Sequence, residues 1–361
     1  MCFTALFCKG INNVVSRRLT RINAVMLSIL LGSTVLLAAC LPGGPADASG
    51  NPTITVYGFS IMKEALDKQI IPEFKEKWRR EHGQEIEFFT SFAGSETIVN
   101  QILYGAPADV AMLSIERDAQ RLFDGKATRT DWHTYPNGGI VNKTPFVILV
   151  RKGNPKGIQD FADLAKPGVD IIHPDPVSSG GAQWSILAIY GSELRKSQDE
   201  TGTQDKVRAV NTLKAIWKNV ISSPGSAREA RTQFELGQGD ALVTYELDAL
   251  LQKQKGQPVE IVVPKITIFS EHPAVIVDRN VTDDRRAAVE AFIEYLWTDE
   301  AQKAFVKYHF RSVTNEAFNS ENLEFATIEE PFDVEMFGGW SKAYPDVIEG
   351  IFRDQVQAET K

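Results

Sequence analysis

The chain has 361 residues, 43% of them hydrophobic, and a formal net charge of −8 at pH 7. This length is enough for two domains of ordinary size. The excess of acidic over basic residues argues against nucleic acid as a partner. It also means that any anionic ligand must be held by local groups, against the overall field of the protein.

The first residues of the chain follow the pattern of an export signal. Four basic and no acidic residues precede Ala24, and an apolar run follows from Val25 to Ala39. A basic stretch, a short apolar core and small residues before a cleavage point are typical of a secretory signal. The run is shorter than the roughly 20 apolar residues that a membrane-spanning helix needs.

The end of this run, Leu37-Ala38-Ala39-Cys40, resembles the lipobox of bacterial lipoproteins. The resemblance implies that residues 1–39 are a signal peptide and that Cys40 carries lipid. The lipid would anchor the exported protein on the outer side of the cytoplasmic membrane or in the periplasm. Residues 40–52, rich in Gly, Pro and Ala, then form a flexible tether. The alternative is an uncleaved anchor helix with an incidental cysteine.

Beyond the tether, short apolar runs alternate with helical patterns. The expected strands cover residues 53–58, 85–90, 109–113, 145–150, 169–172, 241–244, 261–263 and 274–278. The expected helices cover residues 60–80, 95–104, 183–190, 205–219, 227–234, 248–255, 284–297 and 299–308. Pro72 could kink the first helix, and Gly83 ends it. This alternation predicts an α/β fold with parallel strands and right-handed crossovers.

Two apolar extended segments bracket the middle of the chain and suggest how the domains are divided. We expect a first lobe of residues 53–148 and 275–330, and an inserted second lobe of residues 149–274. Residues 331–361 are expected to pack on the lobes. The bracketing segments, near residues 146–150 and 274–277, would act as a hinge.

Small and hydroxyl residues mark four points where a strand leads into a helix, at residues 57–60, 92–95, 178–182 and 225–228. Ligands of open α/β sheets bind beyond the carboxyl ends of the strands, where helix N-termini present unpaired N–H groups. Such termini bind anions without a cationic side chain. Each junction alone could be an ordinary helix cap. Two of them in each lobe predict an anion site in a cleft between the lobes.

The stretch Pro174-Asp-Pro-Val-Ser-Ser-Gly-Gly-Ala-Gln-Trp184, beside Arg151-Lys-Gly-Asn-Pro-Lys-Gly157, carries a resemblance to a known family. Shorter segments at residues 136–140, 225–228, 239–242 and 337–340 fit the same pattern in the same order. From about Thr53 to Phe352, the sequence resembles the periplasmic sulfate-binding proteins of ABC importers.

The resemblance implies a type II periplasmic-binding-protein fold. In this α/β fold, two lobes joined by a hinge of two crossing segments close on a dehydrated sulfate in the cleft between them. It also implies a monomer that is not an enzyme, holds no metal or cofactor, and delivers its ligand to separate ABC permease and ATPase chains.

The resemblance further implies the residues that contact the ligand. These are Gly58, Ser95, Ser179, Gly180, Gly181, Ala227 and Tyr245. Tyr245 stands where the family has a tryptophan whose indole N–H reaches the ligand. This is a departure from the family pattern, because a tyrosine hydroxyl can accept a hydrogen bond as well as donate one. Arg228 is expected to support the site without touching the ligand.

The chemistry of these residues fits sulfate, which is a dianion without a proton at neutral pH. Its site needs donors only, and none of the matched positions is acidic. Hydrogen phosphate still carries a proton and is better served by a site with an acceptor. A buried acceptor that faced sulfate would be repelled and unpaired, at a cost of a few kcal/mol.

Three other functions stay open at this point. The same protein could handle thiosulfate or another tetrahedral oxyanion, it could be a secreted enzyme on a similar fold, or it could be a surface lipoprotein acting in adhesion. The sequence has no nucleophile elbow and no phosphate-binding loop lysine. The histidines have no spacing that suggests a metal site; they are His82, His133, His173, His272 and His309.

Overall fold

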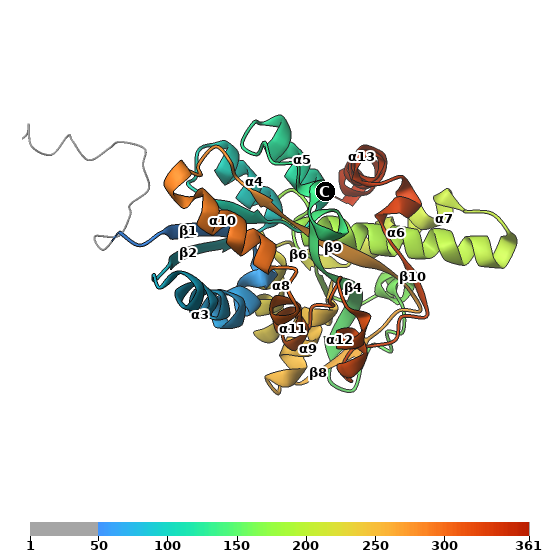
Figure 1. Ribbon diagram of the computed structural model, residues 1–361. Coiled ribbons are helices and arrows are strands. Elements are labelled where there is room, and N and C mark those ends of the chain that lie inside the picture. The colour runs from blue at the N-terminus through green and yellow to red at the C-terminus, as the bar shows by residue number, and fades with distance from the viewer. Residues whose placement is uncertain (1–49, 361) are drawn as a thin grey trace, which may run out of the picture. The chain divides into compact units, whose positions relative to one another are not determined.

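The computed structural model describes residues 50–360 (Figure 1). The expected signal peptide, Cys40 and most of the expected tether therefore lie outside the described residues. No helix within residues 50–360 is both long enough and apolar enough to cross a membrane.

Ten strands form the sheet. They are β1 Thr53–Phe59, β2 Glu87–Ala93, β3 Val110–Met112, β4 Ile140–Arg151, β5 Ile171–Ile172, β6 Val220–Ser222, β7 Ala241–Tyr245, β8 Val259–Val262, β9 Ile266–Ile276 and β10 Glu330–Phe332. Their order is β2-β1-β3-β9-β4-β7-β5-β6, with β8 paired to β4 and β10 paired to β9. Parallel pairing joins β2, β1 and β3, and also joins β7, β5 and β6. We call the part built on the first set lobe 1 and the part built on the second set lobe 2.

The α-helices described are α2 Lys63–Ala65, α3 Ile71–His82, α4 Ser95–Leu103, α5 Glu116–Asp124, α6 Gly180–Thr201, α7 Lys206–Trp217, α8 Ala227–Glu235, α9 Glu246–Gln254, α10 Asp283–Tyr295, α11 Asp299–Lys307, α12 Glu316–Glu321, α13 Trp340–Ala343 and α14 Ala358–Thr360. The 3₁₀-helices are η1 Ser60–Met62, η3 Trp132–Thr134, η4 Pro136–Gly139, η5 Phe161–Ala165 and η6 Val334–Phe337. The π-helices are η2 Leu66–Ile70 and η7 Tyr344–Gln357.

The long antiparallel strands β4 and β9 connect the two lobes. The first half of β4 pairs with β9, and its second half, from Phe146, pairs with β7 and β8. The last residues of β9, Ala274–Ile276, pair with β3 of lobe 1. The expected lobe boundaries, at 148/149 and 274/275, fall inside these two strands. They remain predictions, because both lobes share β4 and β9.

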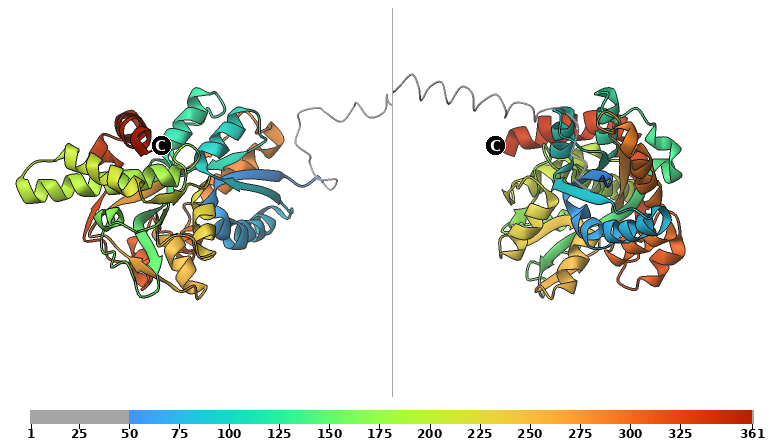
Figure 2. Two further views of the ribbon diagram at one scale, coloured as in Figure 1. Left: turned by 180° about the vertical axis from the view of Figure 1, so that it is seen from behind. Right: turned by 60° about the vertical axis from the view of Figure 1, so that its left-hand side comes forward.

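Helices cover both faces of each lobe (Figures 1 and 2). In lobe 1, α3 and α10 meet through Phe74 and Phe292, whose ring centroids are 5.1 Å apart, while α4 and α5 pack on the opposite face. Strand β4 is buried on both faces, because Val147 and Leu149 point to one cluster and Ile148 and Val150 to another. A strand between two helical layers needs apolar residues on both faces, and the second half of β4, Phe146–Val150, is apolar at every position.

The expected helix over residues 60–80 is present as one continuous right-handed run that ends at His82. Its labelled segments η1, α2, η2 and α3 follow one another without a break, because the residues at their junctions all have helical dihedral angles. Pro72 lies inside this run, just after the wider π-type turn η2, so it does not end the helix, and the kink expected there stays a prediction. Gly83 ends α3 as expected, in the left-handed conformation with φ 63°.

Helix α6 is longer than the expected 183–190. Every residue from Gly180 to Leu194 is buried, so no polar stripe marks the helix in the sequence. The sheet covers one side of α6, and the C-terminal segment, which was not expected to be helical, covers another. The rings of Trp340 and Trp184 meet edge to face, with their centroids 4.7 Å apart. Phe352 meets Trp217 of α7 in the same way, with a centroid distance of 4.4 Å.

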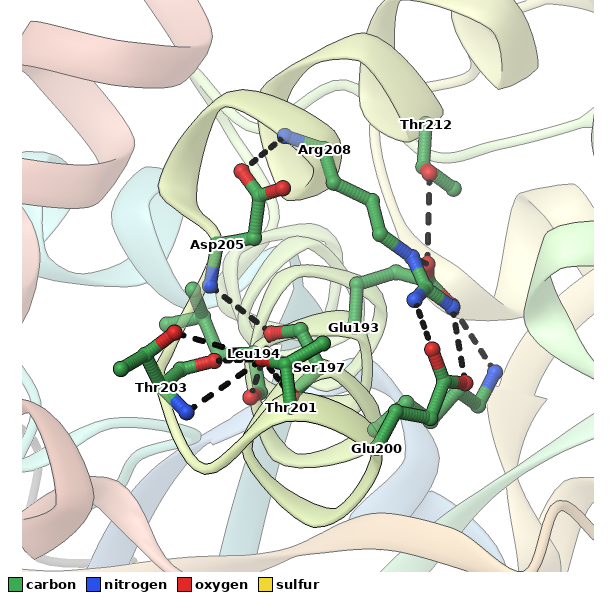
Figure 3. A network of polar contacts seen from close by, with 10 residues as sticks. Glu193, Leu194, Ser197, Glu200, Thr201, Thr203, Asp205, Arg208 and Thr212 are labelled. Carbon is green, nitrogen blue, oxygen red and sulfur yellow. Dashed lines mark hydrogen bonds and ion pairs between the residues drawn. The ribbon is translucent and has the colours of Figure 1, made fainter.

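A buried carboxylate joins the outer half of α6 to α7 (Figure 3). Glu193 accepts hydrogen bonds from Lys196 Nζ at 2.9 Å, from Arg208 Nε at 3.2 Å and from Thr212 Oγ1 at 3.4 Å. Its side chain is only 2% exposed, so these partners compensate for its desolvation. Arg208 also pairs with Glu200, which lies in solvent.

Replacing Glu193 by alanine should lower the free energy of unfolding by about 1–3 kcal/mol, because buried donors lose their acceptor. Urea denaturation followed by circular dichroism measures this. Glu200→Ala is the matched control, since it removes an exposed partner of the same arginine and should cost about 0–1 kcal/mol. Equal losses in the two variants would contradict the structural role given to Glu193.

Candidate functional site

The candidate site lies at the carboxyl ends of the parallel strands, where several helices begin. Strand β1 runs into η1 at Ser60, β2 into α4 at Ser95, and β7 into α9 after Tyr245. Helix α6 begins at Gly180 and α8 at Ala227, both in lobe 2. This edge of the sheet is the one at which α/β proteins bind ligands.

The start of α6 lies directly against lobe 1. A Cβ atom placed on Gly180 would be 2.8 Å from the Cβ of Ser114 and 3.2 Å from that of Ser95. A Cβ on Gly181 would be 2.7 Å from the hydroxyl oxygen of Tyr245. The structure therefore brings four of the expected site residues together, and glycine is needed at positions 180 and 181 because no side chain would fit.

Buried N–H groups without acceptors gather at these helix starts. Ser95, Gly180, Gly181 and Ala227 are each the first or second residue of a helix, and all four are buried. Their N–H groups have no acceptor within the helix. Across residues 50–360, no hydrogen bond from any of these four N–H groups is observed. Ser179 is engaged differently, because its hydroxyl oxygen accepts from the N–H of Ala182 at 3.3 Å.

The starts of η1 and α8 also meet. The N–H of Arg228 donates to Ser60 Oγ at 3.4 Å, and its Nε donates to the Ser60 carbonyl at 3.0 Å. Gly58 lies apart, inside β1 between Phe92 and Met112. In the described part of the chain, Ser60 rather than Gly58 contacts the start of α8.

The hydroxyl of Ser95 is already occupied. It donates to the carboxylate of Asp118 and accepts from the N–H of Ser114 at 3.0 Å. Only the backbone N–H of Ser95 is left for a ligand. Sequence reasoning missed both Ser114 and Asp118. Ser114 had one usable signal, because it is the first hydroxyl residue after the expected strand 109–113.

Asp118 is completely buried behind Ser95. Burial raises the pKa of its carboxyl to about 7, and the negative charge of Glu96 adds to the rise. The hydrogen bond from Ser95 and the charges of Arg121 and Arg117 oppose this shift of the pKa.

Tyr245 is the last residue of β7 and is 1% exposed. Its hydroxyl oxygen lies 2.9 Å from Ser114 Oγ, and its ring lies 4.6 Å from that of Phe146. Burial raises the pKa of the phenol far above its ordinary value. The tyrosine therefore offers a neutral O–H group.

The two lobes are closed around this site. Trp184 Nε1 of α6 donates to the carbonyl of Ser114 at 2.7 Å. A Cβ on Gly94, at the start of α4, would overlap the carbonyl oxygen of Ser178 and lie 2.7 Å from that of Gly225. The backbones of the two lobes thus touch at Gly94, and any side chain there would hold them apart.

Nearby cations are matched by carboxylates. Arg228 pairs with Glu64, and buried Arg231 pairs with Asp248 and Glu64. Positive character at the helix starts therefore comes from N–H groups and helix dipoles. Within residues 50–360, no group of three or more His, Cys, Asp or Glu side chains is placed to hold a metal ion.

The raised pKa of Asp118 predicts a pH effect on stability. The folded protein binds a proton at this carboxyl more readily than the unfolded chain does, so the free energy of unfolding falls as pH rises from about 4 to about 7. In Asp118→Asn this contribution is absent. The stability of the variant relative to wild type should therefore increase across that window.

Urea denaturation at several pH values within the window measures the difference. Asp124→Asn, an exposed change on the same helix, is the control and should leave the pH profile unchanged. Parallel profiles for wild type and Asp118→Asn would show that the Asp118 pKa is not raised.

Residues 54–311 match the family model described as bacterial extracellular solute-binding protein. A sulfate-binding protein of Synechococcus elongatus is 33% identical, over 94% of this chain and 97% of that protein. A thiosulfate-binding protein of Pseudomonas aeruginosa is 32% identical, over 90% of this chain and 98% of that protein.

Among solved structures, the sulfate-binding protein SubI from Mycobacterium tuberculosis is similar, with a TM-score of 0.74 at 29% identity. The match covers 82% of this chain and 99% of that one. The expected α/β fold of type II periplasmic binding proteins is confirmed. The chain belongs to the bacterial extracellular solute-binding proteins, in the group that includes the sulfate- and thiosulfate-binding proteins.

Proposed function

We propose that this protein captures sulfate between its two lobes and delivers it to a separate ABC permease and its ATPase. One observation carries the proposal: buried N–H groups without acceptors lie at helix starts in both lobes, and those of α4 and α6 meet at Ser95 and Gly180. Among the described residues, the two arginines beside the start of α8 are both paired with carboxylates, Arg228 with Glu64 and Arg231 with Asp248. An anion that accepts hydrogen bonds and donates none is the ligand that such a site favours.

The proposed donors are the N–H groups of Ser95, Gly180, Gly181 and Ala227 and the hydroxyl groups of Ser179 and Tyr245. Gly58 stays a prediction, and the start of η1 at Ser60 is the better placed part of that segment. Each donor to a charged acceptor contributes about 1.5–3 kcal/mol. Six or seven donors are enough for micromolar binding, about −8 kcal/mol, after the costs of ordering and desolvation.

The protein in this proposal is a monomeric carrier and not an enzyme. Binding, closure and release require no bond to break, and the similar relatives are named for the anions that they bind. Thiosulfate is the second candidate ligand, because relatives of comparable identity bear its name. It has the charge and tetrahedral shape of sulfate, but one of its terminal atoms is a sulfur, a weaker acceptor than oxygen.

Isothermal titration of residues 50–361 should show sulfate binding at micromolar or lower dissociation constant. Hydrogen phosphate should bind at least ~100-fold more weakly, because its proton faces a site of donors. Gly94→Ala should reduce sulfate affinity by at least ~100-fold, since its Cβ keeps the lobes apart. Gly94 has φ −61° and ψ 145°, which alanine adopts freely, so the ligand-free protein should melt at the wild-type temperature.

Gly225→Ala is the matched control for this experiment. A Cβ there would be 3.3 Å from the flexible end of Glu229, so sulfate affinity should change only a few-fold. A heat of binding with phosphate, together with none for sulfate or thiosulfate, would overturn the proposed ligand. Unchanged sulfate affinity in Gly94→Ala would overturn the placement of the site between the lobes.

We also propose that lipid on Cys40 anchors the protein to the membrane after removal of residues 1–39. The motif Leu37-Ala38-Ala39-Cys40 supports this proposal. Cys40→Ser should abolish incorporation of labelled palmitate in bacterial cells and shift the protein from the membrane fraction to the soluble fraction. Cys8→Ser is the control and should leave labelling unchanged, and continued labelling of Cys40→Ser would rule the anchor out.

A further inference from the structure

Ser114 lies at the centre of the closed site, between the end of β3 and the start of α5, and is 1% exposed. Its N–H donates to Ser95 Oγ at 3.0 Å, and its carbonyl accepts from Trp184 Nε1 at 2.7 Å. Its N–H is therefore used within lobe 1, and its carbonyl is used in joining the lobes. Its hydroxyl is the group that remains.

That hydroxyl is paired with the hydroxyl of Tyr245, at an oxygen–oxygen distance of 2.9 Å. Each hydroxyl has one proton, and a single hydrogen bond between them uses one of the two. If Ser114 donates, the proton of Tyr245 is free; if Tyr245 donates, the proton of Ser114 is free. In the described part of the chain, neither hydroxyl has a second hydrogen-bond partner.

The free proton lies beside the unpaired N–H groups at the start of α6. A Cβ on Gly180 would be 2.8 Å from Ser114 Oγ, and one on Gly181 would be 2.7 Å from the Tyr245 oxygen. The pair thus lies against the first two residues of α6, which carry the backbone donors of that helix. Burial raises the pKa of Tyr245, so its proton is not lost at neutral pH.

We propose that Ser114 is a further ligand-binding residue of this site and acts with Tyr245 as one unit. The pair offers the anion a single O–H donor, which either residue can supply. The proposal rests on the proposed function, because it assumes that an oxyanion occupies the space at the start of α6. It makes one specific demand: the donor should survive the loss of either hydroxyl but not of both.

A double-mutant cycle tests this demand. Ser114→Ala and Tyr245→Phe should each weaken sulfate affinity by no more than about five-fold, because one O–H remains. The double variant should lose about 10- to 100-fold, since a donor to a charged ligand is then missing. Isothermal titration measures the affinities, and circular dichroism checks that each ligand-free variant is folded at the temperature used.

Ser185→Ala is the matched control. Ser185 is a buried serine of α6, more than one turn after the start of that helix. Its hydroxyl oxygen lies 2.5 Å from Nε2 of His173, and it donates to the carbonyl of Ala182 at 2.9 Å. Its loss should lower the melting temperature without changing sulfate affinity by more than about two-fold. This separates a role in ligand binding from a role in packing.

Three results would overturn the proposal. If Tyr245→Phe alone loses as much affinity as the double variant, Tyr245 is the sole donor. If Ser114→Ala alone does so, Ser114 is the sole donor, and if all three variants bind like wild type, the pair does not face the ligand. Failure of the wild-type protein to bind sulfate or thiosulfate is a different result, since it refutes the proposed function itself.

Discussion

The first turn of every α-helix leaves N–H groups without intrahelical acceptors, and here the first turns of α4 and α6 meet in the buried interior while that of α8 lies against η1. Burying these donors unpaired is costly, so the closed form of the protein is favourable only when something accepts their hydrogen bonds. A tetrahedral oxyanion has acceptors in the required number. Close packing at the start of α6 accounts for the glycines, because a side chain at Gly180 would overlap Ser114 and one at Gly181 would overlap Tyr245.

The rest of the architecture lets these helix starts meet and separate. Strands β4 and β9 belong to both lobes, so the lobes can move relative to each other without any break in the sheet. Glu64 and Asp248 neutralise the nearby arginines, which leaves the field of the helix termini to attract the anion. In a chain with net charge −8, local dipoles rather than overall charge have to provide that attraction.

Helix α6 carries two of the proposed donors, the N–H groups of Gly180 and Gly181, and contacts hold it along its length. Trp184 fixes its first turns against Ser114 and Trp340, and Glu193 fixes its outer half to α7 (Figure 3). A donor array on a rigid helix loses little entropy when a ligand binds. The C-terminal segment contributes to this rigidity through the contact of Trp340 with Trp184.

The sequence alone determined the features that depend on neighbouring residues. Strand periodicity, the cap at Ser179 and the Gly180-Gly181 pair indicated the fold and the proposed site, because helix starts are encoded within a few residues. The tertiary structure decided contacts between distant segments. Ser114 and Tyr245 are 131 residues apart, and only closure of the lobes makes them one pair. The length of α6 was also decided there, because a helix buried on all sides carries no periodic signal.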